Sequence, residues 1–208
     1  GIPPNSSIAT GLELSNVDVA FALIVDSFDA SRYWTSAQLT SEQATFIGFQ
    51  GVTVSADSLE VVLNQGGHDN TVVDYASQAL VIDTGSNGIV SLDMDGSQGE
   101  LLEVSLNGAS ADIAGMLYAD GDFILESNNV AGLDFRVPGS TQTADAVGLI
   151  LSGEDASGFA GVESIGLLPT IGFQLENLDF AFSVFAPEVY DNSSTEIANG
   201  NFFAVSGT

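Results

Sequence analysis

The stretch Gly11-Leu12-Glu13-Leu14-Ser15-Asn16-Val17-Asp18-Val19-Ala20-Phe21 recurs as Gly172-Phe173-Gln174-Leu175-Glu176-Asn177-Leu178-Asp179-Phe180-Ala181-Phe182, at an offset of 161 residues (172 − 11). A second match pairs residues 46–51 with residues 202–207, at an offset of 156 (202 − 46). Two ordered matches indicate an internal repeat. We therefore divide the chain into one β-rich repeat unit, residues 1–171, and the start of a second unit, residues 172–208. We expect the second segment either to pack on the next subunit or to fold back onto its own unit.

Short apolar runs, separated by clusters of Gly, Asn, Asp and Ser, indicate β structure around the repeat. In Leu102-Glu103-Val104-Ser105-Leu106 the apolar residues alternate with polar ones and share one face of a strand. Residues 20–25 are apolar throughout, which is typical of a strand buried on both faces. Only Thr35–Thr45 is compatible with a helix, and its Ser and Thr content weakens that interpretation. The sequence predicts an all-β fold of about a dozen short strands.

Two all-β architectures fit this pattern: an elongated sandwich-like module and a solenoid-like one. We favour the sandwich because alternating strands suit antiparallel pairs with one wet face, whereas a solenoid shows a shorter and stricter period. The chain has 13 Phe, and those in the apolar runs are expected to interleave between two sheets. They are Phe21, Phe46, Phe49, Phe123, Phe180 and Phe182.

The charge of the chain excludes several classes of protein. Among 208 residues, 28 are Asp or Glu and only 2 are Lys or Arg, which gives a formal net charge of -26. Such a chain cannot neutralise nucleic-acid phosphates, and it is repelled by an anionic membrane surface. A helix that spans a membrane needs a run of about 18 apolar residues, and the sequence contains no such run. The absence of Cys excludes disulfides and thiolate metal sites. This composition suits a secreted or cell-surface protein in a calcium-rich habitat, or alternatively a halophile.

Five further stretches combine buried-type apolar residues with polar turns: residues 18–23, Trp34-Thr35-Ser36, residues 46–54, Val61-Val62-Leu63-Asn64 and Thr71-Val72-Val73-Asp74-Tyr75. They resemble repeat units that occur in tandem in very large bacterial extracellular or cell-surface proteins. Residues 158–182 are similar to the junction where one such unit runs into the next. The resemblance covers nearly the whole chain, and its motifs are Gly turns and buried aromatic residues. Because such adhesin-like giants often carry calcium-binding repeats, the resemblance implies a secreted, repetitive, structural or adhesive role without catalytic residues.

Two acidic clusters are candidates for binding Ca²⁺, which prefers six to eight oxygen ligands. Asp93 and Asp95 alternate before a Gly turn, and Glu100 follows. Asp120 and Asp122 flank Gly121 in a shorter cluster. The ordinary interpretation is an acidic turn for the first cluster and an Asp-Gly hairpin turn for the second.

The sequence contains no convincing catalytic constellation, and we expect no enzyme. The single histidine, His68, precedes Asp69, but adjacent side chains point apart and cannot form a triad. Arg32, Tyr33 and Trp34 could stack as a sugar platform. The alternative is that Trp34 plugs one end of the core while Arg32 pairs with a nearby acid.

The expected function is a non-enzymatic extracellular structural module. It would build a surface fibre, matrix or adhesin by head-to-tail packing of copies of itself, without nucleic acid and without membrane insertion. The aromatic residues of the second segment are the candidates for assembly contacts: Phe180, Phe182, Phe185, Phe202 and Phe203. The alternatives are a glycan- or ligand-binding β module and an envelope or viral lattice protein.

Overall fold

The computed structural model describes residues 10–47, 50–67, 71–85, 88–137, 140–162, 171–187 and 202–208, with side chains left out over 128–137, 140–147, 186–187 and 202–203. The described chain forms eleven strands and one short 3₁₀ helix. They are β1 (Gly11–Val25), β2 (Tyr33–Ile47), β3 (Val52–Ala56), β4 (Ser58–Gly66), β5 (Leu80–Asp83), β6 (Ile89–Leu92), η1 (Gly96–Gln98), β7 (Leu101–Ile113), β8 (Leu117–Val137), β9 (Ser140–Val162), β10 (Ile171–Pro187) and β11 (Phe202–Gly207).

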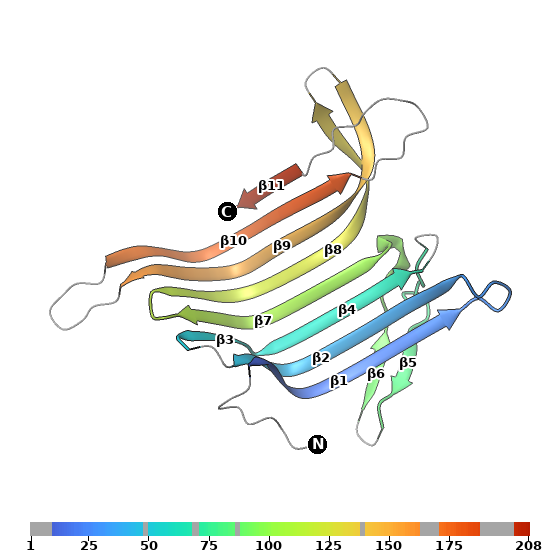
Figure 1. Ribbon diagram of the computed structural model, residues 1–208, viewed down its shortest axis with the longest axis horizontal. Coiled ribbons are helices and arrows are strands. Elements are labelled where there is room, and N and C mark those ends of the chain that lie inside the picture. The colour runs from blue at the N-terminus through green and yellow to red at the C-terminus, as the bar shows by residue number, and fades with distance from the viewer. Residues whose placement is uncertain are drawn as a thin grey trace.

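Nine of these strands form one antiparallel sheet, in the order β1-β2-β3-β7-β8-β9-β10-β11 (Figure 1). Strands β3 and β4 both lie between β2 and β7, since each of them pairs with β2 on one side and with β7 on the other. Strands β5 and β6 form a separate hairpin. The prediction of an all-β, sandwich-like fold is confirmed, with the second layer restricted to the β5–β6 hairpin.

The strands of the large sheet are longer than the sequence pattern predicted. Strand β8 has 21 residues and β9 has 23. The Asn, Asp and Gly clusters that resemble turns in the sequence lie inside several of these strands. The segment with helix-compatible composition is also extended, because Thr35–Thr45 lies within β2 and pairs on both sides.

The β5–β6 hairpin packs on one face of the large sheet, near one end of β1 and β2. A small core forms there from Ala20 and Ala22 of β1 together with Tyr75, Val90, Leu92 and Met94. Beside it lies a buried polar network. Ser36 Oγ donates to Asn64 Oδ1 (3.0 Å), and the Tyr75 hydroxyl donates to Ser36 Oγ (3.1 Å). Asn64 Nδ2 donates to the carbonyl of Val73 (2.9 Å), so the network ties the segment before the hairpin to β2 and β4.

A line of backbone irregularities crosses the large sheet, and we call it the bend line. It contains Asn16, Asp57, Gly108, Gly121, Asp155 and Asn177. Four of these residues have a left-handed backbone: Asn16 (φ 50°), Gly108 (φ 57°), Asp155 (φ 49°) and Asn177 (φ 52°). A left-handed residue inside a strand interrupts the ladder and redirects the chain. Carboxylates cap two N–H groups along the line, since Gly108 N donates to Asp122 Oδ1 (2.7 Å) and Asp155 N donates to Asp179 Oδ1 (3.1 Å).

A second small core lies along the bend line, on the face opposite the hairpin. Its buried members are Ala44, Ala56, Leu59 and Ala109. Leu14 packs against them from one side of the line, and Leu39, Val61 and Val104 pack from the other side. No second sheet lies over these alanines in the described chain. They are buried instead by side chains of the large sheet itself, which come from both sides of the bend line. The sheet therefore bends toward this face.

This face of the large sheet, which we call the apolar face, carries a continuous apolar ladder. Directly paired residues form the ladder from one edge to the other: Val19, Leu39, Val61, Val104, Leu125, Leu151, Phe182 and Val205. The next row belongs to the opposite face and begins with Asp18, Thr40 and Glu60. Away from the bend line the apolar face is open to solvent, with Phe21 60% exposed and Val205 77% exposed.

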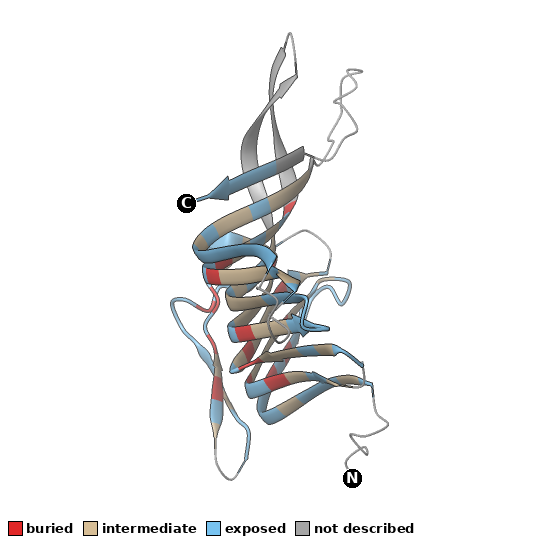
Figure 2. Ribbon diagram, turned by 90° about the vertical axis from the view of Figure 1, so that its left-hand side faces the viewer, coloured by how far each residue is buried: buried red, intermediate tan, exposed pale blue. Residues whose placement is uncertain are grey.

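Two sequence-based expectations about burial are wrong. Residues 20–25 are not buried on both faces, since Ala20 and Ala22 are buried under the hairpin while Phe21, Leu23 and Val25 are exposed. Figure 2 shows that buried residues are a minority along the strands of the large sheet. Phe21, Phe46 and Phe182 do not interleave between two sheets, because the second layer lies on the other face. Phe123 and Phe180 do contact each other, with ring centroids 6.3 Å apart. Phe49 lies outside the described residues.

Candidate functional site

The repeated stretches occupy equivalent positions in the sheet. The first lies in β1, which pairs with β2, and the second lies in β10, which pairs with β11. Asn16 and Asn177 are equivalent at the offset of 161 residues, and both have the left-handed backbone. The sequence repeat is therefore also a repeat of the left-handed Asn position.

The register of β11 corrects the second sequence match. Phe202 pairs with Phe185, and the residue 161 positions before Phe185 is Ile24, which pairs with Trp34. Residue 202 thus occupies the position of residue 34, and not that of residue 46. The similarity of residues 46–51 to residues 202–207 does not reflect equivalent places in the sheet.

Strands β1 and β10 differ in their neighbours. Strand β10 pairs with β9 on one side and with β11 on the other. Strand β1 pairs with β2, and no other described strand pairs with it, so it is an edge of the sheet. The free side of β1 is the equivalent of the side on which β10 binds β9. A sheet edge presents unpaired N–H and C=O groups that can accept another strand.

The predicted assembly residues do not form one patch. Phe180 and Phe182 lie on the apolar face, whereas Phe185 lies on the other face, because successive residues of a strand alternate. The backbones of Phe202 and Phe203 pair with Phe185 and Val184. Strands β10 and β11 thus continue the sheet of their own chain, because β10 pairs with β9 and β11 pairs with β10.

The first predicted calcium cluster is a hydrogen-bonded turn. Asp95 caps η1, and its Oδ1 accepts the N–H of Ser97 (2.8 Å). Hydrogen bonds from the backbone and then the side chain of Ser97 lower the pKa of Asp95 below its ordinary value. Glu100 Oε1 accepts the N–H of Gly66 (3.1 Å), while Asp93 is exposed. The carboxylates of Asp95 and Glu100 thus bind different backbone N–H groups, at Ser97 and at Gly66.

The second predicted calcium cluster lies inside β8. The interpretation of Asp120-Gly121-Asp122 as a hairpin turn is wrong, because the β7–β8 connection lies at residues 114–116. Asp122 caps Gly108 on the bend line. The charge of Asp120 raises the pKa of the Tyr118 phenol, with smaller contributions from burial, a hydrogen bond to Asp120 and the charge of Asp112. In the described part of the chain, no three acidic or histidine side chains are grouped to hold one metal ion.

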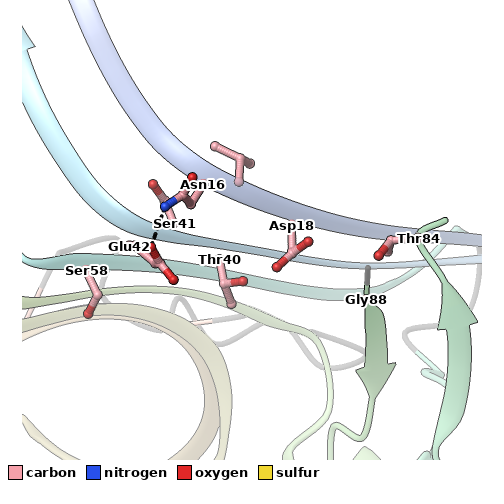
Figure 3. A pocket seen from close by; sticks show the side chains of 9 residues that line it. Asn16, Asp18, Thr40, Ser41, Glu42, Ser58, Thr84 and Gly88 are labelled. Atoms are coloured by element: carbon pink, nitrogen blue, oxygen red, sulfur yellow. Dashed lines mark hydrogen bonds between the residues drawn. The ribbon is translucent and has the colours of Figure 1, made fainter. Parts of the chain in front are cut away.

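An open groove of about 630 Å³ lies between β1, β2 and the tip of the hairpin (Figure 3). Its lining is rich in oxygen: two carboxylates, Asp18 and Glu42, and hydroxyls that include Thr40 and Thr84. Asn16 Nδ2 donates to Glu42 Oε2, which fixes one of the carboxylates. Sequence reasoning missed this groove because the hairpin tip comes to β1 only through tertiary packing.

Arg32 adopts the position expected of a residue paired with a nearby acid. Its Nη1 lies 3.1 Å from Asp26 Oδ2, and its guanidinium lies 5.4 Å from the centre of the Trp34 ring. Trp34 Nε1 donates to Thr71 Oγ1 (3.0 Å), and the ring is half-buried at the end of the sheet. His68 and Asp69 lie outside the described residues.

No protein-family model, curated protein or solved structure matches this chain. None of the described residues belongs to a helix that is long and apolar enough to span a membrane.

Proposed function

We propose that the protein is a non-enzymatic, extracellular structural module whose sheet continues from one repeat unit to the next. In this arrangement β1 of each unit pairs with β9 of the unit before it, as β10 pairs with β9 within this chain. The observation that carries the proposal is the equivalence of β1 and β10 in sequence, position and backbone shape, with Asn16 and Asn177 both left-handed. Units joined in this way form a surface fibre, matrix or adhesin.

The bend line supplies a specific contact for the junction. Asp179 of β10 caps the N–H of Asp155 in β9. Asp18 is equivalent to Asp179 at the offset of 161 residues, and it is exposed in β1. In a continued sheet, Asp18 caps the Asp155 position of the preceding unit. A hydrogen bond to an ionised acceptor is stronger than a neutral one and helps to fix the register.

The charge balance supports a calcium-dependent version of this module. The chain has 28 acidic and 2 basic residues, so the folded state is subject to strong self-repulsion. Bound Ca²⁺ would relieve this repulsion and would favour the folded state by mass action. The acidic residues of the turn at Asp93, Asp95 and Glu100 remain the candidates within that proposal, together with Asp120 and Asp122.

A two-unit chain tests the proposal. It consists of residues 1–171 followed by residues 11–208, so that Gly11 takes the place of Gly172. Because Phe182 pairs with Leu151, Phe21 of the second unit should lie opposite Leu151 of the first unit. The chain has no Cys, so Leu151→Cys in the first unit and Phe21→Cys in the second introduce the only thiols. We expect a disulfide between them, identified by mass spectrometry of unreduced peptides.

Two variants control this experiment. In the native chain, Leu151→Cys with Phe182→Cys should form the equivalent disulfide within one unit. In the two-unit chain, Leu151→Cys with Leu23→Cys in the second unit is out of register by two residues, a separation too great for a disulfide. Equal cross-linking of the in-register and out-of-register pairs in a folded two-unit chain would contradict the proposal.

A glycan-binding module is the second candidate, and the stacking of Arg32 on Trp34 favours it. Aromatic side chains with a polar neighbour suit the faces and hydroxyls of sugars. A glycan array probed with the native chain and with Trp34→Ala tests this function. Binding that is lost in the variant would support a glycan site, and an array without signal would remove it.

A further inference from the structure

We infer that the apolar face is a self-association surface, on which a second copy of the chain packs its own apolar face. This inference does not depend on continuation of the sheet, because that continuation uses the edge of β1 and this contact uses a face. The apolar ladder runs across eight strands, from Val19 in β1 to Val205 in β11. Its members outside β2, β4 and β7 are open, since Val19 is 52% exposed, Leu151 is 37% exposed and Val205 is 77% exposed.

The extent of the apolar face suits a stable dimer. One row through Val17 and Phe123 and another through Phe21 and Leu149 flank the ladder on the same face. Eight strands about 4.8 Å apart, with these three rows along them, cover roughly 35 Å by 20 Å, or about 700 Å² of sheet, and the second core covers part of it over β2, β4 and β7. A typical stable interface buries about 800 Å² on each partner. Soluble monomers rarely leave so large a continuous apolar patch uncovered. Since the β5–β6 hairpin lies on the opposite face, it cannot cover this one.

The distribution of charge identifies a second copy as the occupant. The ladder carries no charged residue, and its neighbours on the same face, such as Phe21, Leu63 and Leu149, are uncharged. Two copies can therefore meet without burying a carboxylate, which would be costly. A basic partner would find no acid on this face, because the adjacent Asp18 and Glu60 belong to the opposite one.

The geometry of the ladder is self-complementary. The ladder and the rows beside it run across the strands of the sheet. A copy related by a two-fold axis therefore places apolar rows on apolar rows. Sheets packed face to face lie about 10 Å apart and interdigitate their side chains. Such an isologous contact closes after two copies. The expected species is thus a discrete dimer that forms a β-sandwich from two single sheets.

Sedimentation equilibrium of the full chain tests this inference. We expect a mass of twice 21.4 kDa, with the dimer favoured by added NaCl, because salt screens repulsion between copies of charge -26. The triple variant Val19→Thr, Leu125→Thr, Leu151→Thr keeps strand-compatible residues but removes apolar area from the centre and edge of the ladder. We expect at least a tenfold weaker dimer. The control variant Val81→Thr, Ile89→Thr changes exposed residues of the hairpin and should dimerise as the native chain does.

A label provides a readout that does not depend on the folding of the triple variant. Pyrene attached to Leu125→Cys should show excimer emission, because two apolar faces bring the labels together. Pyrene on Ile89→Cys should not, because the hairpin lies on the far face. A monomeric native chain would overturn the inference, and so would dimers that the triple variant leaves unchanged. A monomer that co-sediments with phosphatidylcholine vesicles would also overturn it and would assign the face to lipid.

Discussion

Asn16 and Asn177 have the same left-handed backbone, with φ of 50° and 52°, although one lies in β1 and the other in β10, the first and tenth strands along the chain. Asn tolerates this conformation better than other residues with a Cβ do. Both residues lie on the bend line, where β1 and β10 change direction. The repeated sequence thus encodes a repeated bend, and a strand with this bend fits against β9.

Substitutions of Asn177 should show that its backbone conformation stabilises the fold. Asn177→Ala places a residue with an unfavourable left-handed conformation in β10, and we expect a loss of about 1 kcal/mol in the free energy of unfolding. Asn177→Gly should cost little, because Gly adopts positive φ freely. Urea unfolding of both variants is the measurement. An equal loss for Ala and Gly would place the effect in the side chain instead.

The close contact at Gly108 should make this position more sensitive than other glycines with positive φ. A Cβ on Gly108 would lie 2.5 Å from Asp57 Oδ2, whereas a Cβ on Gly99 would meet nothing within 4 Å. Their φ angles are similar, 57° and 75°. We therefore expect Gly108→Ala to destabilise the protein by about 1–2 kcal/mol more than Gly99→Ala does, since overpacking adds to backbone strain. Thermal or urea unfolding measures both variants. Similar losses of stability in Gly108→Ala and Gly99→Ala would contradict a role for the contact with Asp57.

The phenol of Tyr118 should titrate above the ordinary tyrosine range, because the negative charge of Asp120 disfavours the phenolate. A raised pKa in the folded state stabilises the fold at pH values below the unfolded pKa, and this contribution disappears as pH rises through the folded value. Asp120→Asn should lower the pKa of Tyr118. Absorbance titration, with Tyr118→Phe to subtract the other tyrosines, measures this change. An unchanged pKa of Tyr118 in Asp120→Asn would assign the shift to burial and to the charge of Asp112.

Calcium should stabilise the protein more than salt alone. We expect millimolar CaCl₂ to raise the melting temperature more than NaCl of equal ionic strength does, because specific binding adds to screening. The variant Asp93→Asn, Asp95→Asn, Glu100→Gln should lose the excess shift if the acidic turn binds the ion. Equal shifts with both salts in the native chain would reduce the effect to screening.

The buried network at Asn64 should be among the most sensitive polar sites. Asn64→Ala removes the acceptor of the Ser36 hydroxyl and the donor to the Val73 carbonyl, inside a site where Asn64 itself is 1% exposed. We expect a loss of about 2–3 kcal/mol, because buried polar groups without partners carry their desolvation cost. Tyr75→Phe, which removes one hydroxyl from the same network, should cost about half as much. Urea unfolding would contradict this ranking if Asn64→Ala were the milder change.

The sequence predicts the all-β class because the alternation in residues 102–106 follows the two-residue period of a strand. It does not predict strand length, because Asn16, Gly108 and Asp155 resemble turn residues. In the folded chain they are bends inside long strands. Sequence spacing contains no information about whether a left-handed residue reverses the chain or only redirects it.

The open face could not be predicted from residues 20–25 alone. An uninterrupted apolar run fits a strand buried on both sides, and it also fits a strand with small residues under a hairpin and large residues in the open. Ala20 and Ala22 are the small ones, while Phe21 and Leu23 are the large ones. The alternation of side-chain size was the signal that could have separated the two cases. The groove at Asp18 had no such signal, because it depends on where the hairpin packs.

Hydrogen exchange of the two-unit chain tests the continuation of the sheet most directly. Peptides from residues 11–25 arise twice in that chain, once from the free edge and once from the junction. We predict two isotope envelopes, one exchanging as in the native chain and one exchanging more slowly, because pairing with β9 protects the outer N–H groups of β1. A single envelope with the exchange rate of the native chain would contradict the account.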